Sequence, residues 1–460
     1  MIVDIKQTEY PHYVDAVRTL IAGKNMKAHV MTFGCQQNEA DSEKARGILS
    51  DMGYIISNDY NECDIILVNT CAIRAHAEMK ALSMLGNFRA VKRKNPDLIV
   101  GVFGCMAAEN GIVEKLKKDF HYVSFTIEPN MIHTLPENVY KIMHDNKRSF
   151  VFGKDEGNII EYAPVMRSKG SKAWVSIMYG CNNFCSYCIV PYVRGRERSR
   201  DSKTVLAECR ELVVSGIKEI TLLGQNVNSY KSDKTFAQLL ESIANIEGEF
   251  IVRFMTSHPK DVSSELIDVM KKYEGKIAPY FHLPLQSGSD RILSLMNRTY
   301  NRERYLSVVS KLREAIPDIC LSTDVIIGFP TETEEDFLGT MDILEKVRFD
   351  MVYSFNYSPR EGTRAAVMEG AVPDEVKDVR MKKLLLLQDK ISYEKNAEYI
   401  GKKVRVLVES LSKKDDKVYT ARTDSNKLVH IKLEENKIGE FINAEVNGCG
   451  AFDLFAEEIK

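Results

Sequence analysis

The sequence predicts an α/β protein with three folded parts: an open parallel sheet, a central partial (β/α)6 barrel and a small antiparallel β-barrel. Strand patterns alternate with helical patterns in a short series after Lys27 and in a longer one after Ser171, as parallel sheets require. The longer series has six βα units and no dinucleotide-binding glycine fingerprint, which favours a partial barrel. After Gly401 the pattern changes to short strands separated by polar turns, which is typical of a small barrel.

The 460 residues are too many for one ordinary domain. No apolar run is long enough to span a membrane, and the N-terminus lacks the apolar core of a signal peptide. Ten cysteines without a disulfide-like spacing favour a reducing compartment, so we predict a cytoplasmic protein. The expected boundaries are a polar leader at 1–26 with a helix over Tyr10–Ile21, an N-terminal domain at 27–145, a linker at 146–170, the barrel at 171–397 and the last domain at 400–460.

Three cysteines follow the strands predicted for the N-terminal domain. The strands are expected at 27–33, 64–70 and 97–103, and Cys35, Cys71 and Cys105 come one or two residues after them. The carboxyl ends of parallel strands meet at one edge of a sheet, where ligands bind. A single cysteine there would be interpreted as a small buried hydrophobe. Three in equivalent places predict a cluster held by three thiolates.

A second set of cysteines has the spacing C-x3-C-x2-C, at Cys181, Cys185 and Cys188, directly after the first strand of the barrel. One short loop can wrap these thiolates around a single iron–sulfur cluster, and three ligands on four irons leave one iron open for a small molecule. A zinc site would need a fourth ligand, and the next histidine is the distant His258. Three close cysteines cannot all pair as disulfides. The remaining four, Cys63, Cys209, Cys320 and Cys449, show no grouping and are predicted to be structural.

The barrel strands are expected at 174–178, 219–223, 251–256, 278–283, 320–327 and 351–356, with helices such as 204–214 and 334–347 between them. Polar residues follow several of these strands, and in such barrels the chemistry lies at the carboxyl ends. Amides and hydroxyls there can hold the polar parts of a nucleoside cofactor. We therefore predict cofactor contacts from Gln225, Asn226, Gln286 and Ser287. Tyr187, directly before the last cysteine of the loop, is a further predicted contact, because its ring could shield the cluster or stack on the bound molecule.

The net charge of −2 does not indicate nucleic-acid binding, so any such binding must come from local basic patches. One patch lies just beyond the cysteine loop. A second lies on the last domain, whose strands are expected at 404–408, 417–422, 428–432 and 441–446. A solvated charged face is the alternative explanation for both. The predicted phosphate-binding residues are Arg194, Arg196, Arg198, Arg200, Lys402, Lys403, Arg405 and Arg422.

These motifs together resemble the radical S-adenosylmethionine methylthiotransferases. The resemblance covers nearly everything after Lys27, and the C-terminal barrel resembles a TRAM domain, an RNA-binding module. Gln36 and Asn38 favour the tRNA branch that acts on isopentenyl-adenosine, and Gln37 departs mildly from the family's usual Met. The motifs are Gly-Cys-Gln-Gln-Asn at 34–38, Asn-Thr-Cys at 69–71, Gly-Cys at 104–105, the run at 179–200 and Leu-Leu-Gly-Gln-Asn-Val-Asn-Ser-Tyr at 222–230.

The resemblance implies two [4Fe-4S] clusters and catalytic roles for all six cysteines. The cluster on Cys181, Cys185 and Cys188 would cleave S-adenosylmethionine to a 5′-deoxyadenosyl radical that takes hydrogen from C2 of N6-isopentenyladenosine at tRNA position 37. The auxiliary cluster on the other three cysteines would carry the sulfur. A second S-adenosylmethionine would supply the methyl group. The implied partners are the tRNA anticodon stem-loop, a flavodoxin- or ferredoxin-type reductant and a donor that rebuilds the auxiliary cluster; we expect a monomer with no membrane.

Three alternatives stay open at this point. The same chemistry could act on threonylcarbamoyladenosine of tRNA or on an aspartate of a ribosomal protein. A non-enzymatic iron–sulfur carrier or RNA-binding sensor is a different class, but a carrier usually saturates its irons with four cysteines, and both sets here stop at three. A zinc protein is the third alternative.

Overall fold

The computed structural model describes residues 1–72, 75–150, 152–153, 157–167, 170–413, 415 and 417–459. The chain forms two compact units. The first unit contains Met1–Lys169, Met178–Asn182 and Cys188–Asp201, and the second contains Gly170–Ile177, Asn183–Tyr187 and Ser202–Lys460. In the described part of the chain, no helix is both long and apolar enough to cross a membrane.

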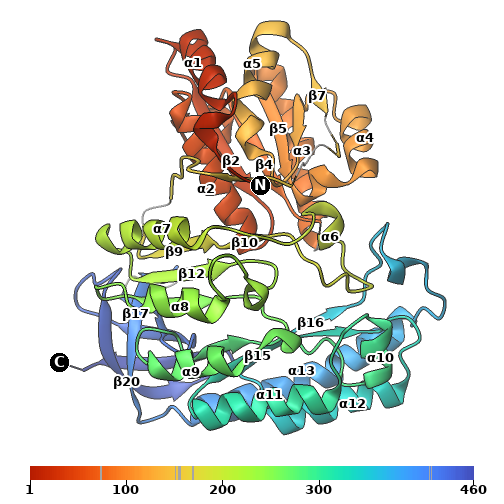
Figure 1. Ribbon diagram of the computed structural model, residues 1–460, viewed down its shortest axis with the longest axis vertical. Coiled ribbons are helices and arrows are strands. Elements are labelled where there is room, and N and C mark those ends of the chain that lie inside the picture. Colours follow the sequence, from red (N-terminus) through yellow and green to blue (C-terminus); the bar gives the residue numbers. More distant parts are fainter. Residues whose placement is uncertain are drawn as a thin grey trace. The chain divides into compact units, whose positions relative to one another are not determined.

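A six-stranded parallel sheet forms the centre of the first unit, in the order β3-β2-β4-β5-β6-β7. Figure 1 labels β2, β4, β5 and β7 of this sheet. The three predicted strands correspond to β2, β4 and β5, which are neighbours in this sheet. Thr32 pairs with Asn69, and Thr70 pairs with Gly104, so these three strands end at the same edge. The strands are β2 (Lys27–Thr32), β3 (Ile55–Ile56), β4 (Ile65–Thr70), β5 (Ile99–Gly104), β6 (Phe125–Ile127) and β7 (Ser149–Phe150).

Helices cover both faces of this sheet because alternate strand residues point to opposite sides. Ile65 and Leu67 pack with the core that includes α1, α2 and α5, whereas Ile66 and Val68 pack with α3 and α4. The helices are α1 (Tyr10–Ile21), α2 (Gln36–Asp51), α3 (Ala75–Lys94), α4 (Asn110–Asp119) and α5 (Leu135–Asp145), with short 3₁₀ turns η1 (Ile5–Gln7), η2 (Tyr60–Glu62), η3 (Cys105–Ala108) and η4 (Ile132–Thr134).

The N-terminal segment is part of the first unit rather than a loose leader. The predicted helix is α1, with the expected bounds, and it buries Tyr10, Val14, Val17 and Ile21. Strand β1 (Ile2–Asp4) pairs in parallel with β8 (Ile159–Glu161) from the predicted linker. The sequence did not predict that α1 packs on the sheet, because α1 is polar apart from one apolar stripe.

A segment that follows the first barrel strand also belongs to the first unit. It contains β10 (Met178–Tyr179), α6 (Val190–Val193) and β11 (Arg198–Ser199), and β10 pairs with β11 in antiparallel fashion. Gly180 lies between them with φ +72°, and a Cβ there would come within 2.1 Å of the Arg196 carbonyl oxygen. Only glycine fits this turn.

The second unit begins with two three-stranded parallel sheets, β13-β12-β9 and β14-β15-β16. A parallel bridge between Val252 and Ile277 links them, so six strands form the predicted partial barrel. The predicted bounds of β12, β15 and β16 match the structure. The strands are β9 (Lys172–Ser176), β12 (Glu219–Leu223), β13 (Ile251–Phe254), β14 (Tyr280–His282), β15 (Cys320–Ile327) and β16 (Met351–Asn356).

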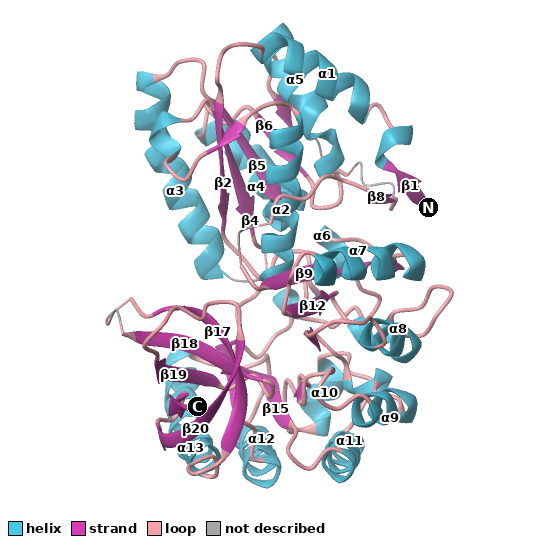
Figure 2. Cartoon of the chain, turned by 90° about the vertical axis from the view of Figure 1, so that its left-hand side faces the viewer, coloured by secondary structure: helices cyan, strands magenta, loops and turns pink. Residues whose placement is uncertain are grey.

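Helices alternate with these strands (Figure 2). Two of them begin with a capping box: Thr235 with Gln238 for α8, and Thr333 with Asp336 for α12. The helices are α7 (Ser202–Val214), α8 (Phe236–Ala244), α9 (Ser264–Lys272), α10 (Asp290–Leu295), α11 (Arg302–Ala315), α12 (Glu334–Val347) and α13 (Asp374–Ala397), with short 3₁₀ turns η5 (Val227–Ser229), η6 (Pro259–Asp261) and η7 (Arg364–Val367).

The C-terminal domain is a closed five-stranded barrel in the order β17-β18-β19-β21-β20. Its last strand, β21, was not predicted, and it pairs in parallel with β19, so the barrel is not wholly antiparallel. The strands are β17 (Lys403–Leu411), β18 (Val418–Thr423), β19 (Leu428–Lys432), β20 (Phe441–Cys449) and β21 (Asp453–Glu458).

This small barrel is attached to the amino ends of the partial-barrel strands. Lys172 opens β9 and pairs with Glu409. Asp350 directly precedes β16 and pairs with Lys427 at 2.8 Å. The attachment therefore lies at the end of the strands opposite to their carboxyl ends, where the chemistry of such barrels is found.

Candidate active site

The loop from Cys181 to Cys188 is held by backbone contacts. Within the first unit, the Cys181 amide donates to the Gly195 carbonyl at 3.1 Å. Within the second unit, the Ser186 amide donates to the Met296 carbonyl at 3.0 Å, and the Asn297 side chain donates to the Phe184 carbonyl at 2.9 Å. The ten cysteines all lie among the described residues, and none of them forms a disulfide.

Arg298 is a further residue at this loop that sequence analysis missed. Its Nη1 donates to Cys185 Sγ at 3.3 Å, and its Nη2 donates to the Pro284 carbonyl at 3.2 Å. Burial opposes the charge, but Tyr300, Tyr187 and Cys185 raise the pKa of Arg298 well above its usual value. A fixed positive charge therefore faces one thiol of the loop.

The loop after β12 contains buried side-chain amide atoms that lack partners among the described residues. Asn226 is 1% exposed, and its Nδ2 donates to Asp261 at 2.7 Å. Its Oδ1, and both polar side-chain atoms of Asn228, are buried with no hydrogen-bond partner among the described residues. Such atoms normally have a partner, so they indicate a missing ligand or water. Gln225 beside them is half-buried. Asn228 was not among the predicted contacts.

The other predicted cofactor contacts lie in rigid surroundings. The Gln286 amide donates to the Asp324 carbonyl at 2.8 Å, which extends the pairing with β15. Ser287 is fully buried, and its Oγ accepts a hydrogen bond from the Ser289 amide at 3.2 Å. Tyr187 packs against an apolar cluster that includes Phe329. These residues are held in place before any ligand binds.

Strained backbone marks three of the strand-end loops. Thr256, Gln286 and Thr331 follow β13, β14 and β15 and have φ values of +67°, +67° and +68°. Non-glycine residues rarely adopt this conformation, and where they do, function is a common reason. The strain therefore agrees with a site at the carboxyl ends of the strands.

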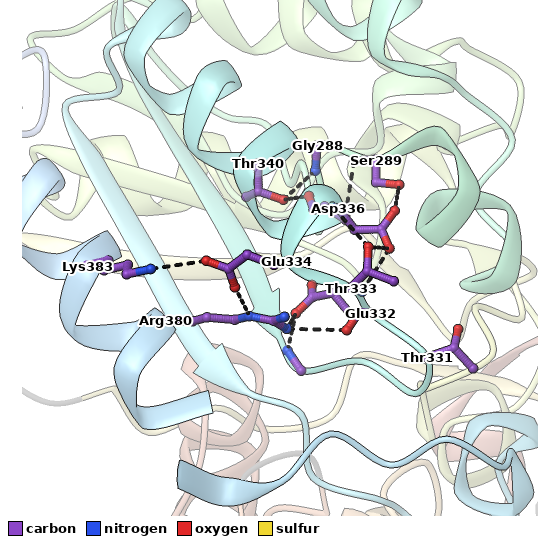
Figure 3. Close-up of polar contacts among 12 residues, drawn as sticks. Gly288, Ser289, Thr331, Glu332, Thr333, Glu334, Asp336, Thr340, Arg380 and Lys383 are labelled. Carbon is purple, nitrogen blue, oxygen red and sulfur yellow. Dashed lines mark hydrogen bonds and ion pairs between the residues drawn. The ribbon is translucent and has the colours of Figure 1, made fainter. Parts of the chain in front are cut away.

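The loop after β15 is fastened by charged residues (Figure 3). Glu332 Oε2 accepts from the Gly328 amide at 2.7 Å and pairs with Arg380 of α13 at 2.9 Å. Burial raises the pKa of Glu332 to about 7, although the Gly328 amide and Arg380 act in the opposite direction. The neighbouring loop is joined to it, since Ser289 Oγ donates to Asp336 at 2.5 Å.

The structure brings the three N-terminal cysteines to one edge of the sheet, as predicted. Cys35 precedes α2 and Cys105 opens η3; Cys71 and Cys105 are buried, and Cys35 is half-buried. Burial raises the pKa of Cys105 to about 11, while Arg194 lowers it and Cys71 and Cys35 raise it. The adjacent ends of β2, β4 and β5 thus gather the three cysteines at one edge of the sheet. We call them the rim cysteines.

A buried amide network supports the rim cysteines. Asn38 Oδ1 accepts from the Cys35 amide at 3.3 Å, and Asn38 Nδ2 donates to Asn69 Oδ1 at 2.8 Å. Asn69 Nδ2 in turn donates to Ser42 Oγ at 2.9 Å. Gly104 has φ +97°, and a Cβ there would come within 2.4 Å of Asn69 Oδ1. The Gly-Cys turn before Cys105 therefore needs glycine.

The four arginines after the cysteine loop have different surroundings. Arg194 and Arg200 are buried, in ion pairs with Asp41 at 3.0 Å and Glu161 at 2.7 Å. Their guanidinium groups are not exposed to RNA, so the predicted phosphate-binding set narrows here to Arg196, which is exposed, and Arg198, which is half-buried. The sequence predicted phosphate contacts for all four arginines, but two of them form buried ion pairs inside the protein.

The basic residues of the C-terminal barrel divide in the same way. Arg405 pairs with Asp424 at 2.9 Å and Arg422 pairs with Glu409 at 2.8 Å, so both serve contacts inside the second unit. Lys402 and Lys403 are exposed. Of the remaining cysteines, Cys63, Cys209 and Cys320 are buried and Cys449 is half-buried.

Both cysteine sets fit an iron–sulfur cluster by their chemistry. Each offers three thiols and one hydrogen bond from an arginine to a sulfur, which are the protein features that hold and tune such clusters. Among the described residues, no three His, Cys, Asp or Glu side chains come close enough to hold a single metal ion. A four-iron cube instead takes its thiolates at separate corners. The unpartnered amides of the β12 loop provide polar groups for a nucleoside cofactor.

Three family descriptions match successive parts of the chain. Residues 27–128 match the uncharacterized protein family UPF0004, residues 175–344 match the radical SAM superfamily, and residues 397–459 match the TRAM domain. The matches follow the N-terminal sheet, the partial barrel and the small barrel in order. The radical SAM match brings S-adenosylmethionine and a [4Fe-4S] cluster as cofactors.

Close relatives are curated as tRNA-2-methylthio-N(6)-dimethylallyladenosine synthases. The protein of Thermoanaerobacter sp. (strain X514) is 47% identical over 442 residues, which cover 95% of this chain and 94% of that protein. The protein of Acetivibrio thermocellus is 48% identical over 453 residues, 96% of this chain and 94% of that protein. The protein of Clostridium botulinum (strain Langeland) is 46% identical and covers 94% of this chain and 96% of that protein.

Solved structures share the fold at much lower identity. The radical S-adenosylmethionine methyltransferase TsrM from Kitasatospora setae, with cobalamin and a [4Fe-4S] cluster bound, matches with a TM-score of 0.55 at 13% identity, over 74% of this chain and 77% of that chain. The apo cobalamin-dependent enzyme OxsB matches with a TM-score of 0.51 at 12% identity, over 79% of this chain and 56% of that chain. Because the curated relatives match nearly the whole chain at 47% and 48% identity, the chain belongs to the family of radical SAM tRNA-2-methylthio-N(6)-dimethylallyladenosine synthases.

Proposed function

We propose that this chain inserts sulfur and a methyl group at C2 of N6-isopentenyladenosine at position 37 of tRNA, with two S-adenosylmethionine molecules per turnover. The family to which it belongs supports this reaction. The observation that carries the proposal is that the chain has two separate sets of three thiols, one in a loop and one on a sheet edge. Each set leaves an iron of its cluster open, one for S-adenosylmethionine and one for sulfur.

When bound, the loop cluster with S-adenosylmethionine supplies a 5′-deoxyadenosyl radical, and the auxiliary cluster supplies sulfur. The protein positions these groups. Cys181, Cys185 and Cys188, which we call the loop cysteines, hold the first cluster, and the rim cysteines hold the second. We assign the polar contacts to S-adenosylmethionine to Tyr187, Gln225, Asn226, Gln286 and Ser287, and we add Asn228 because its amide atoms lack partners among the described residues.

The substrate adenosine lies in the anticodon loop, where a base can be splayed out of the stack. We assign phosphate contacts to Arg196, Arg198, Lys402 and Lys403. The other four predicted arginines are left out because each forms an ion pair inside its own unit. A flavodoxin- or ferredoxin-type protein is the proposed electron donor, and a separate donor rebuilds the auxiliary cluster. We propose a cytoplasmic monomer.

The test is a single-turnover reaction of anaerobically reconstituted protein with S-adenosylmethionine, a reductant and a stem-loop RNA that carries isopentenyl-adenosine. The expected products are the 2-methylthio nucleoside and 5′-deoxyadenosine, identified by mass spectrometry. A matched stem-loop with threonylcarbamoyladenosine should give no methylthio product.

Two other results would contradict the proposal in different ways. Methylthiolation of the threonylcarbamoyl stem-loop alone would move the chain to the sister substrate. Protein that binds iron and RNA but produces no 5′-deoxyadenosine under reducing conditions would favour a carrier or sensor.

A further inference from the structure

A buried guanidinium lies against one of the rim cysteines. Arg194 is 2% exposed, its Nε donates to Cys105 Sγ at 3.1 Å, and its Nη2 pairs with Asp41 Oδ2 at 3.0 Å. Nothing in the sequence distinguishes it from Arg196, which lies two positions further on and is exposed. The two arginines therefore form a natural pair for comparison.

The surroundings of Arg194 compensate its buried charge. Removing a guanidinium from water is costly unless it is paired. Asp41 supplies one carboxylate, and the Gln37 amide already donates to that carboxylate at 3.1 Å. Burial lowers the pKa of Arg194, but Cys105, Asp41 and Cys35 raise it above its usual value. A thiolate-bound cluster would add negative charge beside this guanidinium.

The main chain around Arg194 is fixed on the edge of the sheet that carries the rim cysteines. Ile189 and Val193 of the same short segment pack against Ala72 and Cys105. The Arg194 carbonyl accepts from Asn130 Nδ2 at 3.2 Å and from Arg198 Nη2 at 3.0 Å. These contacts fix the main chain so that the guanidinium lies within hydrogen-bond distance of Cys105 Sγ.

We infer that Arg194 is a positioning residue for the auxiliary cluster. Its guanidinium holds Cys105 by a hydrogen bond, and its positive charge raises the reduction potential of the cluster. The inference rests on the proposed function, because it requires the auxiliary cluster. A hydrogen bond to a ligand sulfur and a nearby positive charge both favour the reduced, more negative cluster. Asp41 weakens this effect because it partly neutralises the guanidinium.

The test is a redox titration followed by electron paramagnetic resonance. It uses the full chain with Cys181, Cys185 and Cys188 all changed to Ala, so that only the auxiliary cluster gives a signal. In this background Arg194→Gln should lower the potential, and Arg194→Lys should lower it less because the charge remains. Asp41→Asn should raise it. Arg196→Gln, which removes an equal but exposed charge from the same segment, should leave it unchanged.

Iron retention gives a second readout that does not depend on activity. After gel filtration, Arg194→Gln should keep less iron per chain than Arg196→Gln, while circular dichroism shows both folded. Equal reduction potentials for Arg194→Gln, Arg194→Lys and the parent, which is the chain with the three loop cysteines changed to Ala, would overturn the inference. A shift of the potential in the same direction in Asp41→Asn and Arg194→Gln would also overturn it. A parent without iron would overturn the auxiliary cluster itself and with it this part of the proposed function.

Discussion

The loop cysteines and the rim cysteines each gather three thiols, but the chain builds the two sets differently. The loop set comes from eight consecutive residues and is held mainly by backbone hydrogen bonds. The rim set comes from the ends of β2, β4 and β5, which are far apart in sequence and meet only when the sheet forms. In both sets one arginine donates to one sulfur: Arg298 to Cys185 at 3.3 Å and Arg194 to Cys105 at 3.1 Å.

This difference predicts which changes in the protein should disrupt each site. A loop site depends mainly on local sequence, so we expect changes inside the N-terminal sheet to leave it intact. A rim site depends on strand register and on buried amides such as Asn38 and Asn69, so it should fail when the packing of the sheet edge fails. The predictions below begin with the largest expected effect, and the first two test this contrast directly.

Single cysteine changes should separate the two sites completely. Cys185→Ala should abolish both 5′-deoxyadenosine formation and thiolation, because the loop cluster starts the reaction. Cys35→Ala should abolish thiolation but still allow S-adenosylmethionine cleavage. Both products are measured in the same single-turnover reaction, and Cys449→Ala, at a half-buried cysteine outside both sets, is the control. Loss of cleavage in Cys35→Ala would contradict the separation.

A backbone change should disable the rim site alone. In Gly104→Ala, the added Cβ meets Asn69 Oδ1 at 2.4 Å and the Thr70 carbonyl at 2.6 Å, at φ +97°. Strain of this kind costs on the order of 1–3 kcal/mol. We expect a lower unfolding temperature and loss of auxiliary iron, with the loop cluster retained.

The matched control is Gly86→Ala. Gly86 lies in helix α3, and a Cβ there would meet nothing within 4 Å. This change should be neutral or should stabilise the protein by up to about 1 kcal/mol. Equal iron content in the two variants would show that the rim does not depend on the Gly-Cys turn.

How much of this contrast the sequence predicts depends on distance along the chain. The loop spacing, the bounds of β12, β15 and β16 and the cysteines after three strands are local patterns, and the structure agrees with them. The burial of Arg194 and Arg200 is not local, because each guanidinium pairs with a carboxylate brought near only by folding. The same holds for Arg298 and for the pairing of β1 with β8.

The unpartnered side-chain oxygen of Asn226 should matter for cofactor binding. Asn226→Ala removes the buried Oδ1, so we expect the KM for S-adenosylmethionine to rise about ten-fold, the effect of one hydrogen bond, with a smaller change in kcat. Asn245→Ala, at an exposed asparagine of the same unit, is the control and should leave KM unchanged. An unchanged KM in Asn226→Ala would remove this loop from the cofactor site.

The smallest effect concerns pH. Burial raises the pKa of Glu332 from its usual 4.5 to about 7, so the folded protein binds this proton more tightly than the unfolded chain. The resulting stability is fully present below about pH 4.5 and is lost as pH rises through 7. Glu332→Gln should therefore flatten the dependence of the unfolding temperature on pH between 4.5 and 7. Glu334→Gln, which removes the other carboxylate on Arg380 (Figure 3), should leave that dependence unchanged.

The most direct test of two independent three-cysteine sites is iron per chain after anaerobic reconstitution. It compares the wild type with two triple alanine variants, one of the rim cysteines and one of the loop cysteines. Two four-iron clusters predict about eight irons in the wild type and about four in each variant. A rim variant that keeps the full iron content of the wild type, or a loop variant that keeps none, would contradict the account.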